Sequence, residues 1–285
     1  VDVARVLDEG VNEVLGLPRS SGDMALNEEI LGNAMVGFPP ATRADQAFGG
    51  VDQSPKPNNH RVLIGTVDAE GCTAYIHLEV CGWDRLAELM KLYNIERLVV
   101  DALPETSKAR ELRAQFPGRV YLAYYPNQAV LKTADQDSIV VGHGEKSGQV
   151  DLDRTATLDQ SARRVRMQQD FFCAMPARLR EQFVTEMTNM VRGTEKDDHG
   201  QPRSFWAEVG PDHWRHAHNY ATVAGDLFRR WGGGITSTSI DLTPGTVQRK
   251  VKAPDGRELV VRPGYIPQAE GVVGPGTPVD WRRRV

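Results

Sequence analysis

Three aspartates stand at places where a folded chain could bring them together. Asp101 ends the short apolar run of Arg97–Asp101 (RLVVD), and Asp52 ends a small, apolar, glycine-containing segment at Ala47–Asp52. Both segments are typical of buried strands. Asp212 follows Pro211 and precedes a long helical pattern, where an acid is a good N-cap. Open α/β sheets place ligands and metals at the carboxyl ends of their strands. We therefore expect Asp52 and Asp101 to lie near each other.

Clustered carboxylates of this kind can bind divalent cations. Two Mg²⁺ or Mn²⁺ ions held about 4 Å apart can activate a water and stabilise a leaving oxygen, which is the chemistry of two-metal phosphodiester hydrolysis. Without cations the carboxylates would repel one another, and at least one pKa would rise. Elements that are distant in sequence but adjacent in a sheet would give such a site its rigidity.

Simpler roles are open for the same residues. Asp52 could end a turn, Asp101 could cap the helix expected at 105–116, and Asp212 could cap the last helix. His213 and His216 are three residues apart on that helix and could flank Asp212 at a metal. Equally, His213 could be a surface residue of the first turn and His216 a packing residue.

Other sequence patterns offer less. The segment Gly142–Ser147 ends in Lys-Ser like a phosphate-binding loop, but it lacks the glycine before the lysine and no helix is expected after it. No serine or cysteine stands in a nucleophile elbow or triad pattern. Four arginines near one helix could contact DNA phosphates or form a solvated helix face; they are Arg154, Arg163, Arg164 and Arg166.

The elements that would position these residues alternate in type. The order is strand, hairpin, helix, strand, helix and strand, which predicts a mixed α/β fold. The first part comprises strands at 47–53, 61–67, 72–80, 97–101 and 120–124, with helices at 83–93 and 105–116. Later elements are strands at 138–141, 149–154 and 204–209, helices at 155–169 and 176–191, a charged loop or turn at 192–203, and a last helix from Asp212 to Trp231.

Composition limits the class of protein. The chain has 285 residues, 40% of them hydrophobic, and a net charge of −4, which argues against a globally basic nucleic-acid binder. Three cysteines without a C-x-x-C pair make a disulfide framework or zinc site a poor fit and favour a reducing compartment. No apolar run reaches the ~18 residues that span a bilayer, so we expect no membrane association.

The chain divides into three regions. Residues 1–46 contain partial helical patterns at Val3–Leu15 and Asn27–Ala34 and form a lead-in or linker. Residues 47–234 form the globular domain. Residues 235–285 are rich in glycine and proline, and we expect an extended tail there.

The order and spacing of five segments resemble the nuclease portion of the large terminase subunit of tailed bacteriophages. Together they cover roughly residues 10–231. They are Asn12–Pro18 (NEVLGLP), Gly50–Asp52 before the hairpin, Leu98–Glu105 (LVVDALPE), Val150–Thr155 (VDLDRT) and Asp212–Ala221 (DHWRHAHNYA).

The resemblance implies an RNase H-like fold, with a central mixed β-sheet flanked by helices, and a site that uses two Mg²⁺ or Mn²⁺ ions. Asp52 and Asp101 match the family's first two metal-binding acids, and Asp212 best matches the third. The sequence departs from the pattern at His216, where relatives of this fold often have another aspartate. The third ligand could therefore be Asp212, with His213 or His216 assisting.

The activity implied is endonuclease cleavage of double-stranded DNA during viral genome packaging, in the cytoplasm of the infected bacterial host. The sequence has no Walker A loop, so an upstream ATPase motor domain of the same polypeptide would drive packaging. The portal protein and the small terminase subunit are the implied partners. Two alternatives are another RNase H-like nuclease, such as a junction resolvase, and a non-catalytic module that docks DNA or the portal.

Overall fold

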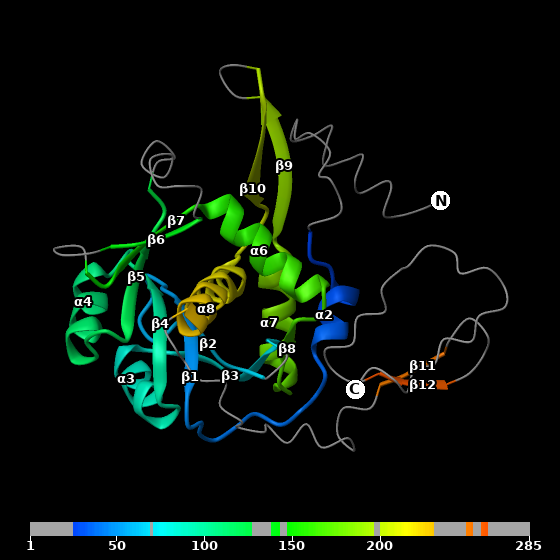
Figure 1. Ribbon diagram of the computed structural model, residues 1–285, viewed down its shortest axis with the longest axis horizontal. Coiled ribbons are helices and arrows are strands. Elements are labelled where there is room, and N and C mark those ends of the chain that lie inside the picture. Colours follow the sequence, from blue (N-terminus) through cyan, green and yellow to red (C-terminus); the bar gives the residue numbers. More distant parts are fainter. Residues whose placement is uncertain are drawn as a thin grey trace.

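A large mixed β-sheet forms the centre of the molecule in the computed structural model (Figure 1). The structure describes residues 25–68, 71–126, 138–142, 147–196 and 200–230, and the backbone of 249–252 and 258–261. The strands of the large sheet are β1 (Ala47–Asp52), β2 (His60–Val67), β3 (Thr73–Cys81), β4 (Ile95–Asp101), β5 (Val120–Tyr124), β6 (Ile139–Val141), β7 (Gln149–Leu152) and β8 (Asp170–Phe172).

The sheet has eight strands in the order β6-β7-β5-β4-β1-β2-β3-β8. β2 is antiparallel to β1 and β3, as expected for the hairpin, whereas β4, β5 and β7 run parallel to β1. Every residue of β1 is buried, which explains why its sequence is small and apolar without alternation. β1 and β4 are neighbours, so their carboxyl ends share one edge of the sheet.

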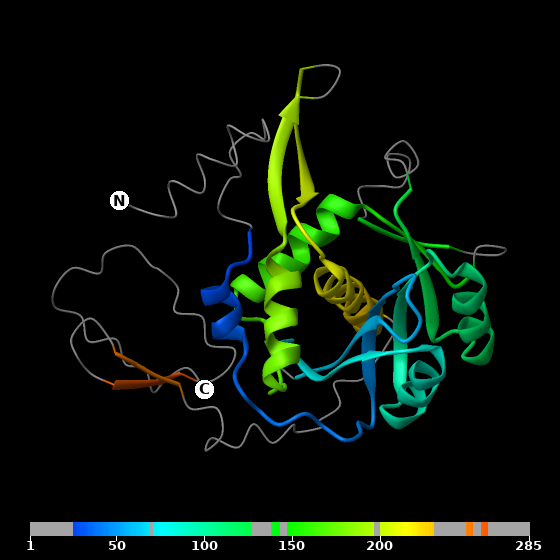
Figure 2. The ribbon, with the colours of Figure 1, turned by 180° about the vertical axis from the view of Figure 1, so that it is seen from behind.

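Helices cover both faces of this sheet. On one side lie α3 (Trp83–Leu92) and α4 (Thr106–Gln115), and on the other α8 (His213–Arg230) crosses β1, β2 and β4 (Figures 1 and 2). The same side holds α6 (Arg154–Arg166), α7 (Ala177–Thr188) and the short α2 (Glu28–Ala34), which contacts α6 and α7. The expected fold class, a central mixed sheet flanked by helices, is confirmed.

The contact between β1 and α8 is unusually close. A Cβ at Gly50 would lie 2.0 Å from the backbone N of Ala221 and 2.3 Å from the backbone O of Ala217. Glycine in the strand and alanines on the helix are therefore what let the two backbones meet. This contact sets the distance between α8 and the sheet, and therefore the position of the first turn of α8.

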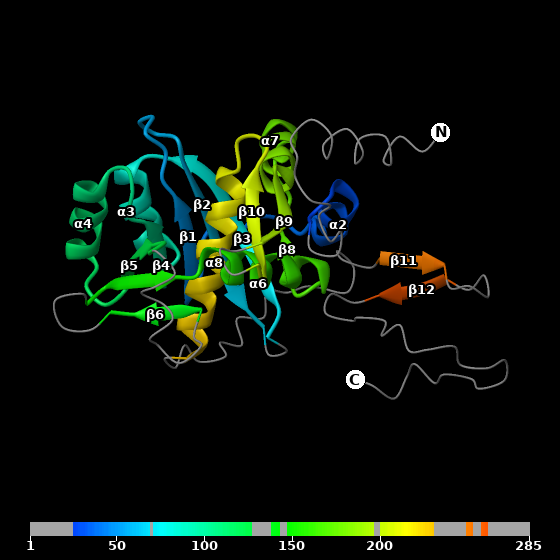
Figure 3. The same ribbon diagram turned by 90° about the horizontal axis from the view of Figure 1, so that it is seen from above.

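Two expectations for residues 176–209 are wrong. The charged stretch 192–203, expected to be a loop, contains most of β9 (Met190–Lys196), which pairs antiparallel with β10 (Pro202–Glu208). The helix expected to reach Val191 ends at Thr188. β9 is polar because its hairpin, which Figure 3 shows from above, extends away from the body of the molecule, as Figure 1 shows, and its backbone pairs with β10. β8 was not expected either, since its three residues are too few for a pattern.

Some expectations fall outside the described residues. They include the helix at 3–15, the end of the last helix at Trp231, most of the phosphate-loop-like segment 142–147, and most of the tail from 235. Within that tail the backbone of β11 (Arg249–Lys252) pairs antiparallel with β12 (Glu258–Val261). In the part of the chain that the structure describes, every helix is too short or too polar to cross a bilayer.

Candidate metal centre

Asp52 and Asp101 end neighbouring parallel strands. The register pairs Val51 of β1 with Val100 of β4, so the two aspartates that follow are lateral neighbours at the edge of the sheet. Asp52 is almost fully buried, with 5% of its surface exposed. The structure therefore brings the two acids together as their positions in the sequence predict.

The first turn of α8 reaches the same edge of the sheet. His213 Nδ1 lies 2.8 Å from Asp52 Oδ2, a hydrogen bond that connects the first residue of α8 to the last residue of β1. This bond raises the pKa of His213 above its ordinary value. Burial raises the pKa of Asp52, although the bond to His213 works in the opposite direction. His213 Nδ1 is therefore the donor of this bond and Asp52 Oδ2 the acceptor.

Asp101 is positioned by the loop that follows β4. Its Oδ1 accepts the backbone N–H of Leu103 at 3.0 Å, and its backbone carbonyl accepts a hydrogen bond from the Gln53 side chain. The Gln53 amide oxygen accepts the backbone N–H of Glu105 at 2.9 Å, so Gln53 bridges the end of β1 to the start of α4. Burial, with a smaller contribution from the charge of Asp52, raises the pKa of Asp101 to about 6.

A second group of ligand-type side chains lies around Asp212. One ligand atom each of Glu208, Asp212 and His216 lies within 4.8 Å of the others. His216 Nε2 is 3.4 Å from Asp212 Oδ2, and its Nδ1 is 3.3 Å from the Tyr125 hydroxyl oxygen. Burial works against the ionisation of Asp212, but the nearby His216, with the charges of His213 and Arg154, outweighs it and lowers the pKa of this carboxyl.

The two groups are close enough for their charges to interact. The charge of His216 acts on both Asp52 and Asp101, and the charge of Asp212 acts on Asp52. The five residues that the sequence proposes as ligands thus lie at the ends of β1 and β4 and at the start of α8, where Asp52 is beside Asp101 and bonded to His213, and Asp212 is beside His216. Sequence reasoning missed Glu208, which ends the unexpected hairpin and is exposed. Its spacing of four residues before Asp212 was the only available signal.

The donor set fits a hard divalent cation. Carboxylate oxygens with an imidazole nitrogen suit Mg²⁺ and Mn²⁺. Asp212 is 8% exposed, and its buried Oδ2 has His216 Nε2 3.4 Å away but accepts no hydrogen bond of normal geometry from the described residues. A buried carboxylate oxygen of this kind normally has a donor or a cation as its partner. Asp52, Asp101, Asp212, His216 and Glu208 could therefore hold metal ions.

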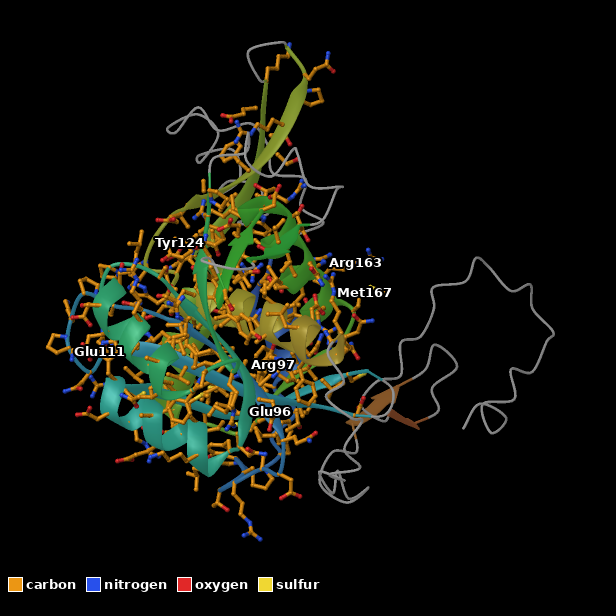
Figure 4. The ribbon with its side chains drawn as sticks, turned by 60° about the vertical axis from the view of Figure 1, so that its left-hand side comes forward. Glu96, Arg97, Glu111, Tyr124, Arg163 and Met167 are labelled. Atoms are coloured by element: carbon orange, nitrogen blue, oxygen red, sulfur yellow. The ribbon has the colours of Figure 1, made fainter. Side chains whose placement is uncertain are left out.

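The four arginines do not form one basic face. Arg164 bonds Asp170 Oδ1 at 2.8 Å, Arg166 donates to the backbone O of Ala25, and Arg154 donates to Glu208 Oε1 at 2.6 Å. Arg163 is exposed. Figure 4 shows it near Met167, the residue that follows α6, and far across the view from Glu111 on α4. Arg163 and the partly exposed Arg154 are the more accessible of the four, although Arg154 is paired with Glu208.

Comparisons with known proteins give a distant likeness. No family model and no curated protein matches the sequence. The structure is similar to the solved large terminase nuclease of thermophilic phage G20c, at 15% identity and a TM-score of 0.41, over 70% of this chain and 98% of that one. The nuclease domain of the Thermus phage P74-26 large terminase is 14% identical, with a TM-score of 0.40, over 67% of this chain and 93% of that one.

A third similar structure is the large terminase nuclease domain of bacteriophage SPP1 with bound manganese. It is 16% identical, with a TM-score of 0.35, over 65% of this chain and 86% of that one. The G20c nuclease has also been solved with bound magnesium and with bound cobalt. The likeness to these nucleases lies in the arrangement of the fold.

Proposed function

We propose that this protein is a metal-dependent endonuclease that cleaves double-stranded DNA by two-metal phosphodiester hydrolysis. The observation that supports the proposal is the adjacency of Asp52 and Asp101 at the ends of β1 and β4, with His213 bonded to Asp52 and the group of Asp212, His216 and Glu208 at the start of α8. Two bound Mg²⁺ or Mn²⁺ ions would supply a nucleophile at neutral pH and stabilise the leaving oxygen.

The chain's own residues would divide the work. Asp52 lies between its strand neighbour Asp101 and the first turn of α8, so it is the best placed to bridge two cations. Asp101 would complete one cation site, and Asp212 with His216 the other. Because Nδ1 of His213 bonds Asp52, this imidazole orients the carboxylate toward the site. Glu208 is a further ligand of the second site, since it is grouped with Asp212 and His216.

The biological setting comes from the resemblance of the sequence motifs. On this resemblance, DNA cleavage would belong to the packaging of a viral genome, in the cytoplasm of the infected bacterium. The ATPase motor domain would be part of the same polypeptide upstream of residues 1–46, which would act as the linker to it. The portal protein and the small terminase subunit would be its other partners. With a net charge of −4 we expect weak DNA binding by this chain alone.

Plasmid cleavage with Mn²⁺ tests the proposal. We expect the wild-type chain to cut supercoiled and linear duplex DNA, and Asp52→Asn and Asp101→Asn each to abolish cutting while the metal-free protein stays folded. Glu111→Gln removes a carboxylate from an exposed ion pair on α4 and is the matched control, with wild-type cutting expected. Wild-type rates of cutting by both aspartate variants would contradict the proposal. Preferential cutting of branched DNA would favour a junction resolvase instead.

A further inference from the structure

An arginine lies directly beside the central aspartate of the candidate site. Arg61 of β2 is the cross-strand partner of Asp52 in the antiparallel register. Opposite residues of an antiparallel pair project from the same face, with Cα atoms only about 4.5–5.5 Å apart. Arg61 is 4% exposed, so its charge is not screened by water. A guanidinium in this place could neutralise Asp52 and compete with any cation for it.

The side chain of Arg61 is instead bound to a glutamate of α7. Its Nε donates to Glu186 Oε2 at 3.1 Å and one terminal nitrogen donates to Glu186 Oε1 at 2.6 Å. The other terminal nitrogen donates to the backbone and side-chain oxygens of Asn59 at 2.7 and 3.0 Å. This two-pronged geometry is the strongest that an arginine and a carboxylate can form. All three nitrogens of the guanidinium are thus engaged away from Asp52.

Glu186 is itself held by other groups. Gln182 Nε2 donates to its Oε1 at 2.8 Å, and the backbone N–H of Trp214 donates to its Oε2 at 3.1 Å. Trp214 is the second residue of α8, where backbone N–H groups lack partners within the helix. Glu186 therefore caps the helix whose first residue, His213, bonds Asp52. These contacts connect the two sides of Asp52. Asp52 pairs with Arg61 across the strands, Arg61 bonds Glu186, and Glu186 bonds the Trp214 N–H. The neighbour of Trp214 in the helix, His213, bonds Asp52.

We propose that Glu186 is a positioning residue that holds the charge of Arg61 away from Asp52 and so leaves this carboxylate free for a divalent cation. The inference rests on the proposed metal-dependent function. Its physical basis is charge balance: a guanidinium paired with a carboxylate exerts little net field on its surroundings, whereas an unpaired one in a buried place repels a cation strongly. The alternative is that the pair only joins β2 to α7.

Metal affinity separates these two readings. We would measure Mn²⁺ binding to the full chain by calorimetry, comparing wild type with Glu186→Gln and with the double variant R61Q/E186Q. The glutamine amide keeps the size of the side chain and an oxygen for the Trp214 N–H, but it leaves Arg61 without a counter-charge. We expect Glu186→Gln to weaken Mn²⁺ binding by about tenfold or more, as expected for an unpaired buried charge near a ligand.

The double variant removes both charges. We expect it to recover Mn²⁺ affinity to within about threefold of wild type, because Asp52 again has no competing cation. Arg61→Gln alone should bind Mn²⁺ as tightly as wild type or more tightly. Glu111→Gln, which removes an exposed carboxylate from an ion pair on α4, is the control and should bind like wild type. Circular dichroism melts identify which variants are folded.

The results overturn the inference in defined ways. If folded Glu186→Gln binds Mn²⁺ with wild-type affinity, the inference is wrong while the proposed function still stands. Equal losses of Mn²⁺ affinity in Glu186→Gln and in the double variant would also overturn the inference, because they indicate a purely structural pair. If the double variant does not fold, a loss of Mn²⁺ affinity in folded Arg61→Gln would likewise overturn the inference. Absence of Mn²⁺ binding by wild type would instead overturn the proposed function, and this inference with it.

Discussion

The carboxylate of Asp101 lies where its charge is unfavourable until a cation arrives. Burial, helped by the neighbouring Asp52, raises its pKa to about 6. The folded protein therefore binds this proton more tightly than the unfolded chain, whose aspartates titrate near 3.9. By linkage the stability contribution of Asp101 is greatest below pH 3.9, falls as the pH rises toward 6, and stays low above that. Ionised Asp101 thus destabilises the metal-free protein at neutral pH.

Asp101→Asn should remove this cost. The amide oxygen can still accept the Leu103 N–H, so the loop contact survives. In EDTA at pH 8 we expect the variant to be more stable than wild type by on the order of 1 kcal/mol, since one pKa unit corresponds to about 1.4 kcal/mol and the site is partly open. At pH 4 the difference should vanish. Urea unfolding at both pH values measures it, and a variant less stable than wild type at pH 8 would contradict the argument.

At the same scale, the sequence indicates some residues of the candidate site and not others. Asp52 and Asp101 could be found because each ends an apolar run, which places it at an edge of the sheet. Asp212 and the two histidines were recognisable from the start of a helix. For Glu208 the spacing of four residues before Asp212 is too weak a signal, because its place depends on how the chain turns between β10 and α8. Arg61 and Glu186 are invisible for a similar reason: the pair joins residues 125 positions apart.

At the scale of the elements, the site depends on the close contact between β1 and α8. Asp52 is on the strand and His213 is on the helix, so the separation of the two backbones sets the distance between the side chains. Gly50 permits that separation, because only a residue without Cβ fits under Ala217 and Ala221. The atoms that a Cβ would meet are backbone atoms, which cannot rotate away as a side chain can.

Gly50→Ala should therefore displace α8. We expect a loss of stability of about 3 kcal/mol or more, as for a severe core overpacking, together with loss of Mn²⁺-dependent cleavage. Urea unfolding gives the first quantity and the plasmid assay the second. Gly32→Ala is the matched control: Gly32 lies in α2 with nothing within 4 Å of an added Cβ, so this change should be neutral or slightly stabilising. Equal stability of Gly50→Ala and wild type would refute the argument.

The helices and strands could be predicted where burial of one face gives the sequence a regular pattern of apolar residues. The strands and helices of the sheet are apolar on the faces that pack, and their positions agree with the sequence to within a few residues. The hairpin of β9 and β10 shows the limit. Most of β9 is charged or polar, because the ribbon buries little and is held by main-chain pairing with β10. Main-chain pairing of this kind does not require apolar residues at regular intervals, so the sequence shows no strand pattern there.

At the scale of the whole molecule, the candidate metal centre joins parts of the chain that are far apart in sequence. Asp52 and Asp101 come from the sheet, whereas Asp212 and His216 come from the start of the last described helix of the domain. Unfolding separates these groups, so a cation that binds them all binds the folded state alone. Metal binding should therefore act as a stabilising force on the entire domain.

Mn²⁺ should accordingly raise the melting temperature of the wild-type chain. At a free concentration 100 times Kd the stabilisation is about 2.7 kcal/mol, which corresponds to roughly 5–10 °C for a domain of this size. Differential scanning calorimetry in EDTA and then in Mn²⁺ measures the shift, with KCl at matched ionic strength as the control. Asp52→Asn should lose most of the shift, since it removes the carboxylate that lies between both groups of ligands. If Mn²⁺ raises the melting temperature of this variant as much as that of wild type, the cation binds elsewhere, because the affinity of a site that includes Asp52 must depend on its charge.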